Sequence, residues 1–183
     1  MSTPGPEALE ARMAALERRV AELEAIEGVR RTLCLYARGI DERRRDLLEL
    51  IFAEDCHLRT TPWGADARGR DRVLRTFERY WQRFSNPRRY YANEDIRVDG
   101  DRATAFSYWF VTQEDGDRSV IGWGTYDWAF RLETGVWKVT ALTVTVLAMT
   151  TLERGWAVPD KVMMPFERRT SPRAGEGGES DAR

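Results

Sequence analysis

The sequence predicts an α+β protein in which the helices come first and a long antiparallel sheet follows. Up to Phe84 the apolar residues recur at helical spacing, and after Asn86-Pro87 they alternate with polar residues over long segments. Turn signals separate these segments at Asp99-Gly100-Asp101, Asp115-Gly116-Asp117 and Thr134-Gly135. A chain of 183 residues is long enough for one domain with a single core.

The first helical segment starts at Glu7 and carries apolar residues in alternating steps of four and three. They are Leu9, Met13, Leu16, Val20 and Leu23. Such a seam is typical of a coiled coil, and it shifts at Ile26. We interpret residues 1–24 as an N-terminal helical extension that lies against a partner subunit or against its own domain. The alternative is an amphipathic helix that faces solvent.

A second helix is predicted from about Ala25 to Arg43, and a short third helix over Arg45–Phe52. The second helix has an apolar line formed by Val29, Leu33, Ala37 and Ile40. Tyr36 lies at one edge of this line and Asp41 near the other. Both polar side chains can therefore reach a cavity that this helix face helps to wall.

The later elements follow from the same patterns. We expect a strand over Cys56–Thr60, a loop from Pro62 to Gly69, and a helix from about Arg72 to Phe84. Four strands come next, at about 88–98, 102–113, 119–132 and 136–147. The domain then occupies residues 25–166, and residues 167–183 are rich in Gly, Ser and charge, which predicts a disordered tail.

Charge and composition argue against several classes of partner. The 29 Lys and Arg residues are scattered among 30 Asp and Glu residues, so no basic surface for nucleic acid is expected. The N-terminal helix is charged, unlike a signal peptide, and the longest uncharged run, Val139–Leu152, is too short to span a bilayer. We expect a cytoplasmic protein with no membrane or nucleic-acid partner.

The sequence predicts chemistry without a cofactor or a metal. His57 is the only histidine, which excludes a His-rich metal cage and leaves one possible base for a nucleophilic arrangement. Cys34 and Cys56 lack metal-binding spacing and are expected to be reduced. The segment Gly64–Arg70 has the wrong glycine spacing for a phosphate loop.

Aromatic side chains gather on single faces of the predicted strands. Tyr126, Trp128 and Phe130 share one face of their strand, since alternate residues point the same way. In the preceding strand the same rule separates Ser107, Trp109 and Val111 from Phe106, Tyr108 and Phe110. Seven tryptophans, at positions 63, 81, 109, 123, 128, 137 and 156, add flat apolar surface. Any one ring can be ordinary core, but together they favour an aromatic, terpenoid or polyketide-like ligand.

Asp41 is the best candidate for a general acid or base, because an apolar cavity makes a carboxylate easier to protonate. Tyr36 can donate its phenolic proton to a carbonyl or hydroxyl oxygen. Arg89, on the same predicted strand face as Tyr91 and Asn93, can hold an enolate, carboxylate or phenolate oxygen. Asp41 can instead pair with Arg43, Arg44 or Arg89, and Tyr36 can be a core ring.

Several short motifs in a fixed order resemble the SnoaL-like branch of the NTF2-like superfamily, which includes polyketide cyclases, scytalone dehydratase and bile-acid dehydratases. They are Y-x4-D at Tyr36 and Asp41, F-A-x-D at Phe52–Asp55, G-R-D-x-V at Gly69–Val73, N-x4-V-D-G-D-x-A from Asn93, and G-x-Y-x3-F-R from Gly124 with G-x-W-K-V from Gly135. The resemblance covers roughly residues 25–150. It implies an α+β cone in which a strongly curved, mostly antiparallel sheet wraps around three to four N-terminal helices.

The resemblance also implies a function. We expect a cofactor-independent cyclase, dehydratase or isomerase that acts by general acid/base catalysis on a hydrophobic, oxygenated natural-product intermediate. Asp41, Tyr36 and Arg89 are the expected catalytic residues. The expected substrate contacts are Asn93, Tyr91, Tyr126, Trp128, Phe52, Trp63, Trp109 and His57. A homodimer formed through the open face of the sheet is the usual arrangement of the family.

Two positions depart from the family's pattern. Dehydratase-like members carry a histidine where Arg89 stands, and arginine cannot act as a base at ordinary pH, which argues against a histidine-driven dehydration. Related cyclases often carry an acid where this chain has Trp128. The alternative is therefore a non-catalytic binding or assembly subunit, similar to the β subunit of ring-hydroxylating dioxygenases. The two hypotheses differ in whether Asp41 points into an enclosed cavity or is ion-paired at the surface.

Overall fold

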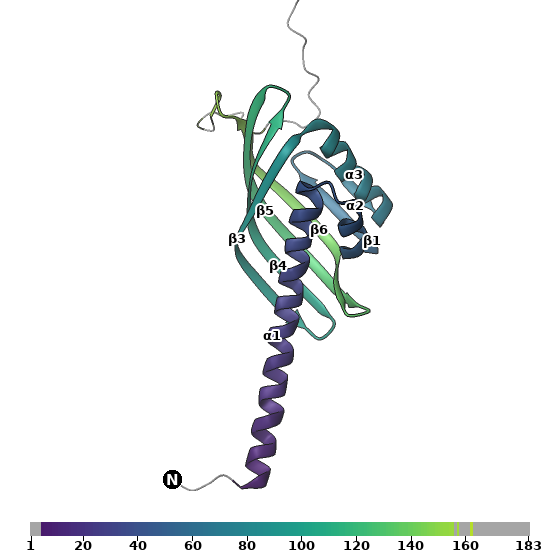
Figure 1. Cartoon of the computed structure of the whole chain (residues 1–183), viewed down its shortest axis with the longest axis vertical. Coiled ribbons are helices and arrows are strands. Elements are labelled where there is room, and N and C mark those ends of the chain that lie inside the picture. The colour runs from purple at the N-terminus through teal and green to yellow at the C-terminus, as the bar shows by residue number, and fades with distance from the viewer. Residues whose placement is uncertain (1–4, 156, 158–161, 163–183) are drawn as a thin grey trace, which may run out of the picture.

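Three helices and one six-stranded sheet form the described part of the chain, which confirms the predicted α+β class (Figure 1). The computed structural model describes residues 5–155, 157 and 162. Its elements are α1 (Pro6–Asp41), α2 (Arg45–Ile51), β1 (Phe52–Thr61), β2 (Asp66–Arg68), α3 (Arg70–Arg83), β3 (Ser85–Asp99), β4 (Arg102–Asp115), β5 (Arg118–Glu133) and β6 (Val136–Thr151). The predicted tail, residues 167–183, and Trp156 lie outside the described residues.

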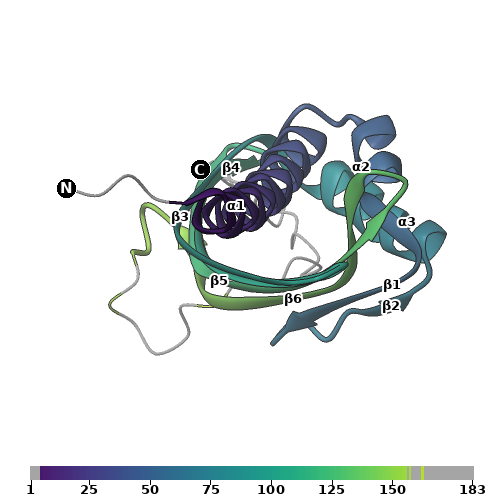
Figure 2. The same ribbon diagram turned by 90° about the horizontal axis from the view of Figure 1, so that it is seen from below.

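The sheet is curved and mostly antiparallel, as expected. Its strand order is β2-β1-β6-β5-β4-β3, and β1 with β6 is the one parallel pair among the described strands. The sheet bends around the C-terminal half of α1, and α2 and α3 close one side of the hollow (Figure 2). The strand β2 falls inside the segment predicted as a loop, where Asp66–Arg68 pairs with His57–Arg59.

The first helix is one unbroken element of 36 residues, so the prediction of two separate helices is wrong. The pattern shifts at Ile26 because the surroundings of α1 change there. Its C-terminal half packs on the sheet and buries Val29, Leu33, Tyr36 and Ile40, while the seam from Leu9 to Leu23 is exposed.

The contact of α1 with β6 is close. A Cβ at Gly28 would lie 2.7 Å from Cδ1 of Trp137, and the Thr32 hydroxyl donates a hydrogen bond of 2.7 Å to the Trp137 carbonyl. A side chain at position 28 would therefore push the helix away from the sheet. This contact fixes the height at which α1 crosses the concave face.

The alternation of side chains along β4 and β5 follows the predicted parity. Ser107, Trp109 and Val111 are buried on the concave face, and Tyr108 and Phe110 are exposed on the outer face. Along β5, the buried residues Tyr126, Trp128 and Phe130 share the concave face. The core therefore lies between this face and the helices.

Chain length and apolarity also bear on membrane contact. Among the residues that the structure describes, no helix is both long enough and apolar enough to span a membrane.

Gly124 lies where β5 and β6 shift register, and this position tolerates no side chain. A Cβ there would lie 1.8 Å from the Thr145 carbonyl oxygen and 2.8 Å from Cζ2 of Trp109. We expect Gly124→Ala to lower the free energy of unfolding by about 3 kcal/mol, because the backbone of β6 has to move. Urea denaturation measures this. Gly5→Ala, which meets no atom within 4 Å, is the control and should change stability by less than about 0.5 kcal/mol.

Candidate functional site

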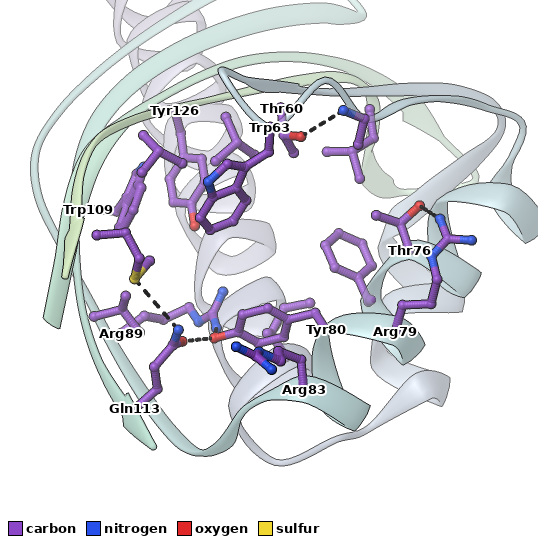
Figure 3. A pocket seen from close by; sticks show the side chains of 18 of the residues that line it. Thr60, Trp63, Thr76, Arg79, Tyr80, Arg83, Arg89, Trp109, Gln113 and Tyr126 are labelled. Atoms are coloured by element: carbon purple, nitrogen blue, oxygen red, sulfur yellow. Dashed lines mark hydrogen bonds between the residues drawn. The ribbon is translucent and has the colours of Figure 1, made fainter. Parts of the chain in front are cut away.

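A cavity of about 120 Å³ lies between the concave face of the sheet and the helices α1 and α3 (Figure 3). It is partly open to solvent. The residues that line it are Tyr36, Ile40, Leu58, Thr60, Trp63, Ala65, Thr76, Phe77, Arg79, Tyr80, Arg83, Arg89, Trp109, Val111, Gln113, Tyr126, Val144, Val146 and Met149. For comparison, a dry apolar cavity of about 150 Å³ holds one benzene molecule. The volume of the cavity therefore suits one ring of a ligand, and the rest of the ligand can extend towards the opening.

Most of the cavity wall is apolar. Trp63, from the turn after β1, lies across the cavity from Tyr80 of α3 (Figure 3). Trp109 donates a hydrogen bond of 3.2 Å from Nε1 to the Thr125 carbonyl, and its ring centroid lies 5.7 Å from that of Tyr126. These contacts fix the orientation of the indole. The cavity thus offers flat rings on which a planar ligand can stack.

A buried ion pair stands at the polar end of the cavity. The backbone N of Arg89 donates to Oδ2 of Asp41 at 2.9 Å, and its Nε donates to Oδ1 at 2.6 Å. The Asp41 side chain is 13% exposed and that of Arg89 is 7% exposed. Arg89 lines the cavity, and Asp41 stands behind it with both carboxylate oxygens occupied. The sequence left open whether Asp41 is available as a general acid or base or is paired with an arginine. In the structure it is paired with Arg89.

Local structure explains why these two residues meet. Asp41 is the last residue of α1, and Nε1 of Trp81 donates to the carbonyl of the preceding Ile40 at 2.8 Å. This bond uses one of the carbonyls that the end of a helix leaves unpaired. The strand β3 passes this helix end, so the Arg89 backbone and side chain reach the same carboxylate.

Tyrosine hydroxyls surround the Arg89 guanidinium. Nη2 of Arg89 donates to the Tyr80 hydroxyl at 3.1 Å, and that hydroxyl donates to Oε1 of Gln113. The guanidinium carbon lies 5.5 Å from the ring centroid of Tyr80 and 6.0 Å from that of Tyr36, within range of a cation–π interaction. Tyr126 completes the cluster, with its ring centroid 5.8 Å from that of Tyr36. One fixed cation and three hydroxyls thus gather at one end of an apolar cavity.

The protonation states of this cluster follow from burial. Burial raises the pKa of Tyr36, Tyr126 and Tyr80, in the last case to about 12. For Arg89, burial acts to lower the pKa, but the tyrosine hydroxyls around it act in the other direction, and the net pKa lies above the ordinary value. At neutral pH the tyrosines are therefore neutral donors and Arg89 is a cation. Donors outnumber bases here, so the cluster can stabilise negative charge on an oxygen.

The structure brings five of the predicted site residues to the cavity wall. They are Tyr36, Arg89, Tyr126, Trp63 and Trp109. Three others lie in the core around the cavity and do not line it. Phe52 packs on the rings of Tyr36 and Phe77, and Trp128 lies edge-on to Tyr36 at 5.0 Å between centroids.

Tyr91 is the third of these core residues, with its ring beside Tyr36 and Tyr126. Its hydroxyl is buried and has no hydrogen-bond partner among the described residues. Burial raises the pKa of Tyr91 well above the ordinary value. It is therefore a further neutral donor next to the cluster.

Asn93 and His57 lie outside the cavity, which corrects the sequence prediction. Asn93 is exposed and has a positive φ of 59°, in a bulge where the pairing of β3 with β4 shifts register. The bulge breaks the alternation that placed Asn93 on the face of Arg89. His57 is on the other side of β1 from the buried Cys56 and Leu58, and its Nε2 lies 2.7 Å from Oδ1 of Asp66.

Tyr80 and Gln113 are functional candidates that the sequence analysis did not select. Tyr80 lies in the last turn of α3, and its hydroxyl contact with Arg89 joins two residues on different elements. Gln113 has the same strand parity as Trp109 and Val111. A polar residue at a strand position that faces inward is the sequence signal that could have identified Gln113 as a candidate.

Across the described ranges, no group of three or more His, Cys, Asp or Glu side chains is placed to hold a metal ion.

The fold and the cavity define a cone-shaped α+β protein of the NTF2-like class, built around a small-molecule-sized hollow. The chain belongs to the SnoaL-like domain family, whose sequence profile matches residues 21–143. The family resemblance drawn from the motifs is thus confirmed. The comparison with curated protein sequences gave no match.

Solved structures show the same fold at low sequence identity. A candidate scytalone dehydratase from Novosphingobium aromaticivorans is 22% identical with a TM-score of 0.65, over 70% of this chain and 87% of the other. A hexachlorocyclohexane dehydrochlorinase, LinA type 2, is 18% identical with a TM-score of 0.69, over 79% and 99%. LinA-type3 from Novosphingobium barchaimii is 19% identical with a TM-score of 0.68, over 77% and 99%. At these identities the likeness concerns the fold.

The ion pair predicts a large effect of removing one partner. Asp41→Asn leaves the Arg89 cation buried without its counter-charge, and we expect a loss of about 3 kcal/mol in the free energy of unfolding. Replacing both residues, as in Asp41→Asn/Arg89→Met, should recover most of this loss. Urea denaturation measures all three proteins. Asp46→Asn, which breaks an exposed pair with Arg44, is the control and should cost at most about 1 kcal/mol. An Asp41→Asn variant as stable as this control would contradict the buried pair.

The buried tyrosines predict a loss of stability at alkaline pH. Below the ordinary tyrosine pKa of 10.0 both states are protonated and the stability is fully present. Above it the unfolded chain ionises while the folded chain keeps its protons, so the free energy of unfolding falls as pH rises towards 12. Urea denaturation from about pH 9 to 11 measures the slope. Tyr80→Phe should reduce the slope, and Tyr90→Phe, at an exposed position, should leave it unchanged. Equal slopes in all three proteins would contradict this account.

Proposed function

We propose that the cavity binds a hydrophobic small molecule that carries an oxygen, and that the protein is a cofactor-independent lyase, isomerase or cyclase that activates this oxygen. One observation carries the proposal. The Arg89 guanidinium, held by Asp41, stands beside the hydroxyls of Tyr36, Tyr80 and Tyr126 at the end of an apolar cavity. The rings hold the carbon skeleton, and the donors select a carbonyl, hydroxyl or enol oxygen at one end.

The chemistry that this arrangement supports is stabilisation of negative charge on the bound oxygen. Hydrogen-bond donors that are fixed before the reaction need no reorganisation as charge develops, and one such donor is commonly worth about 100- to 1,000-fold in rate. Arg89 supplies a permanent positive charge, and Tyr36 or Tyr126 can pass its proton to the oxygen. Ring closure or isomerisation through an enol needs this kind of assistance, and the proton that leaves the α-carbon passes to solvent, which reaches the partly open cavity.

Asp41 is a positioning residue in this scheme. Both of its carboxylate oxygens accept hydrogen bonds from Arg89, so it orients the guanidinium and does not meet the ligand. This changes the role that the sequence analysis gave it. Base-driven elimination is accordingly less well supported than oxygen activation.

Ligand binding without catalysis is the second candidate function. It is favoured by the same ion pair, because both oxygens of the Asp41 carboxylate, which stands behind the cavity's polar end, accept hydrogen bonds from Arg89. The two functions share the cavity and the oxygen-binding end. They differ in whether a bound ketone reacts.

Recognition of the oxygen can be tested with two ligands that differ only in a carbonyl, 2-tetralone and tetralin. Quenching of tryptophan fluorescence measures binding, since Trp63 and Trp109 line the cavity. We expect 2-tetralone to bind at least about tenfold more tightly, because a hydrogen bond to a charged donor contributes about 1.5–3 kcal/mol. Asp41→Asn/Arg89→Met should lose this preference without leaving a buried charge. Arg88→Met, at an exposed neighbouring position, should keep it. Equal binding of the two ligands by the unmodified protein would overturn the proposal.

Catalysis can be tested by the exchange of the α-protons of 2-tetralone in D2O, followed by NMR. If the cluster stabilises an enolate oxygen, exchange should be at least about tenfold faster with the protein and should fall in Tyr126→Phe. Arg88→Met again serves as the control. Tight binding of 2-tetralone with exchange no faster than in buffer would assign the protein to the binding function.

A further inference from the structure

The N-terminal half of α1 presents an apolar stripe that no part of the described chain covers. Leu9, Met13, Leu16, Val20 and Leu23 are between 46% and 60% exposed. This half of the helix projects beyond the end of the sheet (Figure 1). A stripe of large apolar residues on a projecting helix is typical of an interaction surface.

The stripe has the spacing of a coiled coil. In a heptad written abcdefg, Leu9, Leu16 and Leu23 occupy d positions, and Met13 and Val20 occupy a positions. Leucine at all three d positions and the β-branched Val20 at one a position favour two strands. The partner that fits is therefore one more helix of the same kind.

The charges beside the stripe match a second copy of this chain in parallel orientation. The e positions are all acidic, Glu10, Glu17 and Glu24, and the g positions include Arg12 and Arg19. In a parallel pair, a g residue faces the e residue of the following heptad on the other helix. Arg12 then faces the partner's Glu17, and Arg19 faces the partner's Glu24. An antiparallel pair would instead bring Glu near Glu and Arg near Arg.

The stripe points away from the domain to which its helix belongs. At 3.6 residues per turn it lies about half a turn from the line of Val29, Tyr36 and Ile40, which packs on the sheet. A second helix can therefore approach α1 without meeting the sheet of either copy. Because α1 is continuous into the core, the helix is already formed, and association does not have to include the cost of helix nucleation.

We propose that residues 9–23 of α1 form a parallel, in-register, two-stranded coiled coil with the same residues of a second copy. The two domains then lie on opposite sides of the coiled-coil axis, at the same end of the paired helices. No residue that lines the cavity belongs to this segment, so the pairing uses none of the cavity wall. Ligand binding and the proposed dimer are thus independent properties.

Whether the apolar stripe mediates pairing can be tested by the assembly state of the full chain. Leu16→Glu/Val20→Glu places charges inside the proposed seam and should halve the molar mass measured by sedimentation equilibrium. Ala11→Glu/Ala15→Glu adds the same charges on exposed positions away from the stripe and should leave the mass unchanged. An equal mass for the two variants would overturn the proposal.

The orientation is tested by disulfide formation in a Cys34→Ser background, which removes the exposed native thiol. Leu9→Cys should cross-link to Leu9→Cys of a second copy at least about tenfold faster than Ala11→Cys cross-links to its counterpart. In a parallel pair, equivalent d positions such as residue 9 face each other across the seam, whereas f positions such as residue 11 point away from it. An antiparallel pair would place a positions opposite d positions, with residue 9 opposite residue 20, so a mixture of Leu9→Cys and Val20→Cys would form the mixed dimer instead. That result, or equal rates for Leu9→Cys and Ala11→Cys, would overturn the parallel coiled coil.

Discussion

The ion pair between Asp41 and Arg89 joins the end of α1 to β3, and the polar end of the cavity depends on it. Placing two charges in a largely dry environment is costly, and their attraction offsets that cost only when the geometry is good. Here the carboxylate receives the backbone N–H and the Nε of one residue, at 2.9 and 2.6 Å. The arginine is thereby fixed in position as well as in charge. Tyr80 and Tyr36 then pack against a guanidinium that cannot turn away.

A cation in this place gives the cavity a different chemical character from a histidine. Arginine keeps its charge at any ordinary pH and offers only donors, whereas histidine can take up and release a proton. With buried, neutral tyrosines around it, the cluster is rich in donors and poor in bases. Substrates suited to such a cavity are those whose oxygen gains negative charge during the reaction. The apolar walls strengthen the effect, because electrostatic interactions are stronger where water is scarce.

Sequence patterns predicted the parts of the fold that obey a simple period. The strand parity of β4 and β5 grouped Trp109 and Tyr126 with the residues that share their faces, and the structure shows that these faces are concave. The helical period placed Tyr36 beside the cavity. The failures occur where the period is interrupted. A bulge at Asn93 turns that side chain outward, and the shift at Ile26 marks a change of packing partners within one continuous helix, not the helix end that the pattern predicts.

Periodic patterns in the sequence cannot predict contacts between elements that are distant in the chain. Tyr80 of α3 reaches Arg89 of β3, and Gln113 reaches Tyr80 from β4. The sequence shows each residue on a buried face but cannot show which hydroxyl meets which guanidinium. The Asp41–Arg89 pair is an intermediate case, since the sequence analysis named Arg89 as one of three possible partners of Asp41 and the structure selects it.

The same helix serves the cavity and the exposed stripe, and its continuity links the two. A break at Ile26 would have let the N-terminal segment fold back and cover its apolar residues on its own domain. Because α1 stays straight through Gly28 and is held by the Thr32 bond to the Trp137 carbonyl, the stripe is kept away from the sheet and exposed. This exposed apolar surface can be removed from water only by contact with a second molecule. Such burial stabilises the complex by about 25 cal/mol per Å². The packing of α1 on the sheet positions Tyr36 and Asp41. The same packing keeps the N-terminal half of the helix exposed and available for a partner.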